Sequence, residues 1–250
     1  MNGFRNIKTI TKRELSGYFS SPVAYVFIVI FLLLTGFFTF TFTAGGFFER
    51  GQASLDGSFF TWHPWLYLFL VPAVGMRLWA EERRVGTLEL LLTMPITAWQ
   101  AILGKFIASW VFLGLALALT FPVVITVNFL GSPDNGMIFT AYLGSFLMAG
   151  AYLAISCMTS AMTRNQVVSF ILAVVICLFL VLCGFPPVTN MLNQLDKPWP
   201  VNLVAGFSVM THFTWFSRGV MDSRDFVFYF SVIVFSLFTT GVILRSHRSG

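Results

Sequence analysis

The sequence predicts a single-domain, all-helical membrane protein, and three observations support this fold class. Hydrophobic residues make up 57% of the 250-residue chain and charged residues only 10%, with a mean hydropathy of +0.82. That is too little charge to cover a water-soluble globule of this length. Charge-free runs repeatedly reach the about 20 residues that a helix needs to cross the hydrocarbon core, twice the length of a barrel strand. An ordinary soluble enzyme is therefore excluded.

The apolar runs predict six transmembrane helices preceded by a helix that lies on the membrane surface. In residues 4–19, apolar side chains recur at helical spacing and Arg5, Lys8 and Lys12 follow another face, a pattern typical of an amphipathic interfacial helix. Residues 131–136 carry the Gly, Ser, Pro and Asn of a turn, which predicts a tight hairpin. We place the spans at about 23–43, 58–76, 106–130, 137–163, 167–185 and 226–244.

One uncharged stretch, residues 199–217, is long enough for a seventh crossing but has the wrong composition. It contains Pro200, Asn202 and Gly206 together with several aromatic residues. These residues suit a re-entrant or interfacial segment that is supported by protein. We therefore expect residues 187–225 to form an outer segment before the sixth span.

The distribution of basic residues predicts that both termini lie in the cytosol. Lys and Arg accumulate in the cytosolic loops of membrane proteins. With six spans and a cytosolic N-terminus, eleven of the fifteen Lys and Arg residues lie inside and four outside. The eleven are Arg5, Lys8, Lys12, Arg13, Arg77, Arg83, Arg84, Lys105, Arg164, Arg245 and Arg248, and the four are Arg50, Lys197, Arg218 and Arg224.

Several residues that often mark function are better interpreted as structural. The three cysteines lie in or beside apolar spans without a CxxC motif, so we expect packing residues and no metal site. His63, His212 and His247 are expected to be interfacial or hydrogen-bonded. Small residues recur every fourth position on the fourth span and predict close helix packing within the chain. These groups are Cys157, Cys177 and Cys183, and Ala141, Ser145 and Ala149.

The densest charge cluster lies between the second and third spans, in residues 80–97. On a helix, Glu82, Val85, Gly86 and Glu89 share one face, while leucines after residue 87 form an apolar stripe. The charged face could therefore contact a partner, and the leucine face could pack against the helix bundle. Gly86 weakens a helix by roughly 1 kcal/mol relative to Ala, so we expect a bend or a close approach there, with Thr87 capping a further short helix.

This segment carries a specific resemblance. Its pattern E-x-R-x-G-T-L-E-x-L-L-x-x-P-I-T, over residues 82–97, is followed by Gly104-Lys105 at the start of the third span. Together with the basic amphipathic N-terminal helix and a first span that opens at Ser21-Pro22, it resembles the permeases of the ABC-2 transporter family. Within that family it is most similar to the small gliding-motility-type permeases. The resemblance covers most of the chain, which would be a single ABC-2 transmembrane domain over residues 1–250.

The resemblance implies a function and its partners. Two membrane subunits would pair, as a homodimer or a heterodimer, and each would be held by one of two cytosolic ABC ATPase subunits. A coupling helix within residues 80–97 would receive the ATPase, and the N-terminal helix would make a second contact. The outer segment would close the pathway. The implied coupling residues are Glu81, Glu82, Arg83, Arg84, Gly86, Thr87 and Glu89, and those of the second contact are Lys8, Lys12, Arg13 and Glu14.

The chain itself lacks the phosphate-binding loop of an ATPase. Gly104-Lys105 is followed by Phe106, and Trp99 stands where the loop needs glycine. We therefore expect a non-catalytic permease of the inner (cytoplasmic) membrane, without a cofactor of its own. Its partner would bind ATP and Mg²⁺ and drive the export of a substrate that the sequence does not identify. A non-transporting scaffold that recruits a cytosolic ATPase is the alternative. Sparse charge within the spans disfavours a secondary transporter or channel.

Overall fold

A computed structural model describes residues 2–40, 47–50, 54–87, 96–185, 187–188, 190, 204 and 206–246. The described part of the chain is helical and contains no strand. The helices are α1 (Asn2–Ser20), α2 (Pro22–Phe40), α3 (Phe47–Arg50), the 3-10 helix η1 (Phe60–Trp62), α4 (His63–Gly75), α5 (Arg77–Val85), α7 (Ala98–Ala118), α8 (Phe121–Leu130), α9 (Asn135–Met162), α10 (Gln166–Leu182), α13 (Val209–Ser217) and α14 (Ser223–Ser246).

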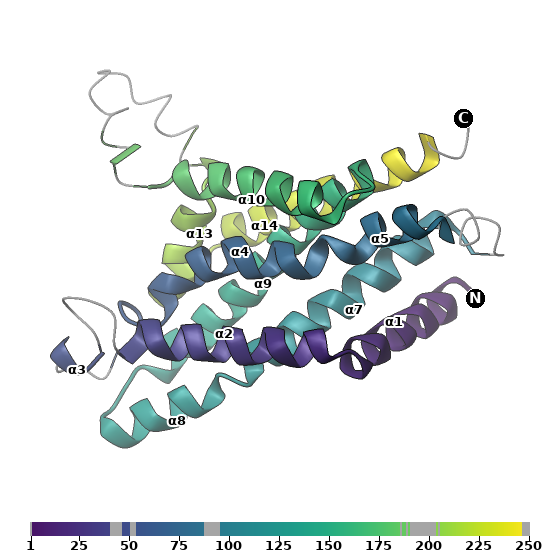
Figure 1. The fold of residues 1–250 in the computed structure, drawn as a ribbon. Coiled ribbons are helices and arrows are strands. Elements are labelled where there is room, and N and C mark those ends of the chain that lie inside the picture. Colours follow the sequence, from purple (N-terminus) through teal and green to yellow (C-terminus); the bar gives the residue numbers. More distant parts are fainter. Residues whose placement is uncertain are drawn as a thin grey trace.

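Helix α9 lies at the centre of the bundle, and α4, α5, α7, α10, α13 and α14 pack around it (Figure 1). Of its most apolar stretch, 78% is buried, against 22% for α2 at the periphery. The small residues expected on its face, Ala141, Ser145 and Ala149, are all buried against neighbouring helices. Gly144 brings α9 so close to α13 that an added Cβ would lie 2.5 Å from Phe216. The prediction of close packing within the chain is therefore confirmed.

Four helical stretches are long and apolar enough to cross a membrane: Pro22–Phe40, Ala98–Leu130, Asn135–Met162 and Ser223–Ser246. They coincide with the first, third, fourth and sixth predicted spans, although the third begins earlier than residue 106. The fifth corresponds to α10, a shorter apolar helix of 17 residues. The predicted turn at residues 131–136 is confirmed, because the Asp134 side chain accepts hydrogen bonds from Gly136 N and Met137 N at the start of α9.

The predicted second span, residues 58–76, does not form a single long helix. It is divided into η1 and α4, which has 13 residues, and the chain continues beyond Met76 as α5. Pro64 lies in the first turn of α4 and Pro72 lies inside it, where it lacks the N–H that would continue the hydrogen-bond ladder. The chain thus extends from the apolar bundle into the charged segment through two successive helices.

The outer segment is described only in part, since residues 191–203 and 205 lie outside the described residues. Within residues 199–217 the structure shows α13, which has nine residues and is too short to cross a membrane. Its N-terminus is capped by Ser208, and it packs against α9. The start of α1, the end of α14 and α5 all lie toward the opposite end of the bundle (Figure 1).

Candidate functional site

Helix α5 begins at an interruption that α9 stabilises. Ser160 of α9 donates a hydrogen bond to Met76 O at 2.8 Å and accepts hydrogen bonds from Trp79 N and Ala80 N, each at 3.0 Å. The first N–H groups of a helix have no partner within the helix, so they need an acceptor from elsewhere. A side chain from a distant part of the sequence thus caps α5 and fixes its position on the bundle.

The Ser160 hydroxyl provides a first test of this arrangement. We expect Ser160→Ala to lower the free energy of unfolding by about 1–3 kcal/mol, because it leaves buried backbone N–H groups of α5 without an acceptor. Ser156→Ala in the same helix is the matched control, since the Ser156 hydroxyl donates to Tyr152 O of its own helix and has no other hydrogen-bond partner among the described residues. Reversible denaturation in detergent would measure both. Equal losses would contradict the role of Ser160 as a cap.

A buried lysine joins three helices beside this interruption. Lys105, on α7, has a side chain that is 6% exposed and lies 2.8 Å from Glu82 Oε1 of α5 and 3.5 Å from Glu14 Oε2 of α1. Its Nζ is 5.5 Å from the centre of the Trp79 ring, also on α5. Because one cation serves two carboxylates and an aromatic face, α1, α5 and α7 are held together electrostatically. We call Lys105, Glu14 and Glu82 the charge cluster.

Helix α1 packs along α7 through further polar and aromatic contacts. Tyr18 OH lies 2.8 Å from Ser109 Oγ, and the Tyr18 ring stacks on Phe112 at 4.9 Å. Burial raises the pKa of Tyr18 to about 12, so its hydroxyl stays protonated at neutral pH. The Thr11 hydroxyl donates a hydrogen bond to Gly104 O at 3.2 Å. The two helices are so close here that a Cβ added to Gly104 would lie 2.7 Å from the Ile10 side chain. Helix α1 thus covers the residues predicted to form the amphipathic helix, and one face of it packs firmly on α7.

The predicted coupling residues on α5 differ in what they contact. Glu82 points inward to Lys105, and its second oxygen, Oε2, is buried without a hydrogen-bond partner among the described residues. Arg83 donates a hydrogen bond to Ala161 O of α9. Burial, and secondarily the charge of Arg164, lowers the pKa of Arg83. Glu82 and Arg83 therefore attach α5 to its own bundle.

The other predicted coupling residues that the structure describes, on α5 and directly after it, lie at the surface. Glu81 and Arg84 form an exposed ion pair of 2.7 Å, three residues apart on α5. Gly86 ends α5 with a φ of 78°, so the glycine serves a left-handed helix end, and no described residue lies within 4 Å of an added Cβ there. Thr87 is helical, whereas residues 88–95, which include Glu89, lie outside the described residues. The predicted apolar stripe therefore has no described structure.

The basic residues predicted for a second contact lie on the outer face of α1. Lys8, Lys12 and Arg13 are exposed, whereas Glu14 is half-buried and pairs with both Arg13 and Lys105. The structure thus separates Glu14 from the three cations. It belongs to the inner contact with α7, and they remain available on the surface.

Sequence reasoning missed the roles of Lys105 and Ser160. The sequence indicated Lys105 as a topology signal and as part of the Gly104-Lys105 motif, but not as an ion-pair partner, although a lysine several residues inside an apolar helix is itself a sign of a buried partner. No local pattern marks Ser160, because its partners on α5 are about eighty positions away in the sequence. Among the described residues, no group of three or more His, Cys, Asp or Glu lies close enough to hold a metal ion.

Comparison with known proteins gives one family match. The model of the ABC-2 family transporter proteins matches residues 67–242, which is well over half of the chain. The matched region includes α5, α7, α9, α10 and α14, and so contains Lys105, Glu82 and Ser160. No curated protein matches the chain significantly.

Proposed function

The chain belongs to the ABC-2 family of transporter proteins, and from this we propose that it is the permease subunit of an ATP-driven transporter whose ATP is hydrolysed by a separate cytosolic ATPase. The chain is a multi-pass membrane protein and its family works with an ABC ATPase. The finer points of the proposal are that two permease subunits pair, that two ATPase copies dock on them, and that the substrate is exported.

The observation that carries this proposal is the attachment of α5 to three other helices. Ser160 fixes its first turn to α9, and Lys105 fixes Glu82 to α7 and Glu14 to α1. A short helix held this rigidly cannot absorb a displacement locally, so a push on its exposed end moves the bundle. This is the property that a coupling element between an ATPase and a membrane pathway requires.

The arrangement of the helix ends supports a cytosolic position for this site. The start of α1 and the end of α14 lie at the same end of the bundle as α5 (Figure 1). An even number of crossings puts both termini on the same side of the membrane. Six crossings with cytosolic termini also place eleven of the fifteen basic residues inside. We infer that the exposed residues Glu81, Arg84 and Thr87, with Glu89, face the ATPase in the cytosol.

A charge exchange on α5 tests the docking of the ATPase. In the double variant Glu81→Arg/Arg84→Glu the two residues can still pair with each other, so the stability of the chain should change by less than about 1 kcal/mol. The order of charges that α5 presents to a partner is reversed. We therefore expect the amount of ATPase that co-purifies with the chain in mild detergent to fall at least tenfold. Arg245→Glu, at the end of α14, is the control. ATPase recovery equal to that of the unmodified chain would refute this docking surface.

Transport separates a permease from a scaffold. The complete complex in proteoliposomes should show ATP-dependent movement of a substrate, and the Glu81→Arg/Arg84→Glu variant should reduce it in parallel with ATPase binding. A scaffold would bind the ATPase with the same sensitivity to the variant yet move nothing. Screening candidate substrates against the ATPase rate of the complex would find the class that stimulates it.

A further inference from the structure

A cavity of about 440 Å³ lies where α1 turns into α2, facing the junction of α4 and α5. It is bounded by residues of these helices and by Lys105 and Phe112 of α7. The proposed function makes no use of this space. Its position at the boundary between the interfacial helix and the first span places it at the level of the lipid headgroups.

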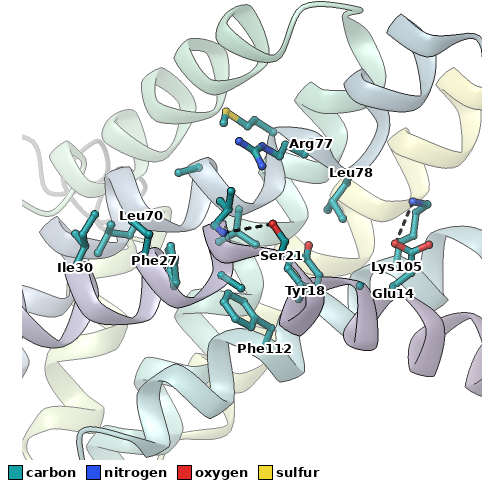
Figure 2. A pocket seen from close by; sticks show the side chains of 17 residues that line it. Glu14, Tyr18, Ser21, Phe27, Ile30, Leu70, Arg77, Leu78, Lys105 and Phe112 are labelled. Carbon is teal, nitrogen blue, oxygen red and sulfur yellow. Dashed lines mark hydrogen bonds and ion pairs between the residues drawn. The ribbon is translucent and has the colours of Figure 1, made fainter.

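The lining of the cavity changes from charged to apolar along its length. Figure 2 shows Glu14 and Lys105 at one end, Tyr18, Ser21 and Arg77 in the middle, and Phe27, Ile30 and Leu70 at the other end. The apolar end lies along the first span, where the side chains face the hydrocarbon region. A molecule that fills the cavity must therefore be amphiphilic, with its polar group near Ser21 and Arg77.

The net charge of the polar part is positive. Glu14 pairs with Arg13 at 2.8 Å, and Lys105 pairs with Glu82 at 2.8 Å while also lying 3.5 Å from Glu14, so these two carboxylates are balanced by two cations. Arg77 is exposed and forms no ion pair or hydrogen bond within the described part of the chain. Arg77 and Ser21 both line the middle part of the cavity (Figure 2). An arginine fork with a neighbouring hydroxyl group is suited to a phosphate, with which it can form two parallel hydrogen bonds.

We propose that this cavity binds one anionic phospholipid of the cytosolic leaflet, with its phosphate at Arg77 and Ser21 and one acyl chain along Phe27, Ile30 and Leu70. The membrane supplies such a lipid at the depth of the cavity, and burial of the chain adds to the attraction between the cation and the headgroup. The lipid would touch both α2 and the start of α5. It would thus fill the space between the first span and the coupling element.

Native mass spectrometry of the full-length chain tests the proposal. The protein, with its ATPase if this co-purifies, would be incubated in mild detergent with phosphatidylglycerol or phosphatidylcholine. We expect one phosphatidylglycerol to be retained per chain, in preference to phosphatidylcholine. Arg77→Gln should reduce this retention about fivefold, the factor expected for the attraction of one cation to an anionic lipid. Arg77→Lys should retain most of the preference.

Two controls make the result decisive. Arg164→Gln removes another exposed cation of the same end of the bundle, outside the cavity, and should leave retention unchanged. Ala73→Phe fills the apolar part of the cavity and should abolish retention while Arg77 is kept, with the elution volume on size exclusion reporting a folded chain. Equal losses in Arg77→Gln and Arg164→Gln would overturn the proposal. Displacement of the lipid by millimolar inorganic phosphate would overturn it too, because the site would then bind free phosphate.

Discussion

Lys105→Met should lower the free energy of unfolding by about 3 kcal/mol, because it leaves two partly buried carboxylates without their cation. Methionine keeps the length and apolar stem of lysine, so the change removes charge with little change in packing. Glu82 should account for most of the loss, since its oxygen is 2.8 Å from Lys105 Nζ and that of Glu14 is 3.5 Å away. Reversible denaturation in detergent measures the effect.

A double-mutant cycle attributes the loss to the ion pair. Glu82→Gln in the Lys105→Met background removes the unpaired carboxylate, and we expect it to recover at least about half of the lost free energy. Arg84→Gln, which alters an exposed pair on the same helix, should cost less than about 1 kcal/mol. If Glu82→Gln brought no recovery, the destabilisation would come from packing around Trp79 and the charge cluster would have no energetic role.

Lys105→Met should also uncouple ATP hydrolysis by the ATPase from transport. Lys105 is a positioning residue, because it touches α1 and α5 rather than any substrate. With the cluster removed, α5 should still bind the ATPase through its exposed end while transmitting less of its displacement. We therefore expect ATPase binding to persist and transport per ATP hydrolysed to fall several-fold. A parallel loss of binding would indicate that Lys105→Met merely disrupts the docking surface.

The sequence predicted the positions of the long helices well, because lipid imposes a simple requirement of apolar length. The second predicted span even ends at residue 76, where α4 gives way to α5, but the sequence could not predict the contacts that support such interruptions. The break at Met76 depends on Ser160, and the break between α7 and α8 at Thr120 is supported by the hydroxyl of Tyr142 at 2.8 Å. In both cases a distant helix satisfies backbone or side-chain groups that the interruption frees, and only the tertiary arrangement brings them together.

The assignment of residues 80–97 as a coupling segment stays a prediction, but the structure changes the interpretation of its faces. Helical periodicity within residues 80–97 placed Glu82 on a face that could meet a partner. In the structure α5 follows directly from α4, so its rotation is fixed by Ser160 and by the bundle, and this turns Glu82 toward Lys105. A reversal of charge at Glu82 would consequently damage the fold. Exposed Glu81 and Arg84 are the better probes of a partner.

Gly75→Ala should be as damaging as the loss of Lys105, although it adds only one carbon atom. The new Cβ would lie 2.3 Å from Ser156 Cβ on α9, far inside contact distance. Both atoms are fixed to helix backbones, so α4 and α9 must separate, and we expect a loss of about 3 kcal/mol in the free energy of unfolding. Gly36→Ala on α2 is the control, because nothing lies within 4 Å of its added Cβ.

Removing the opposing atom should rescue the fold and test the coupling geometry. In Gly75→Ala/Ser156→Gly the nearest remaining atom is the backbone carbon of residue 156 at 3.5 Å, an ordinary contact. Stability should return to that of Ser156→Gly alone, and a double variant no better than Gly75→Ala would refute the close approach. Gly75 precedes Met76, whose carbonyl accepts the Ser160 hydrogen bond one turn further along α9. Because α9 contacts the chain on both sides of the α4–α5 junction, the junction cannot bend when α5 is displaced, and the displacement is transmitted to α4. The double variant that regains stability should therefore regain transport as well.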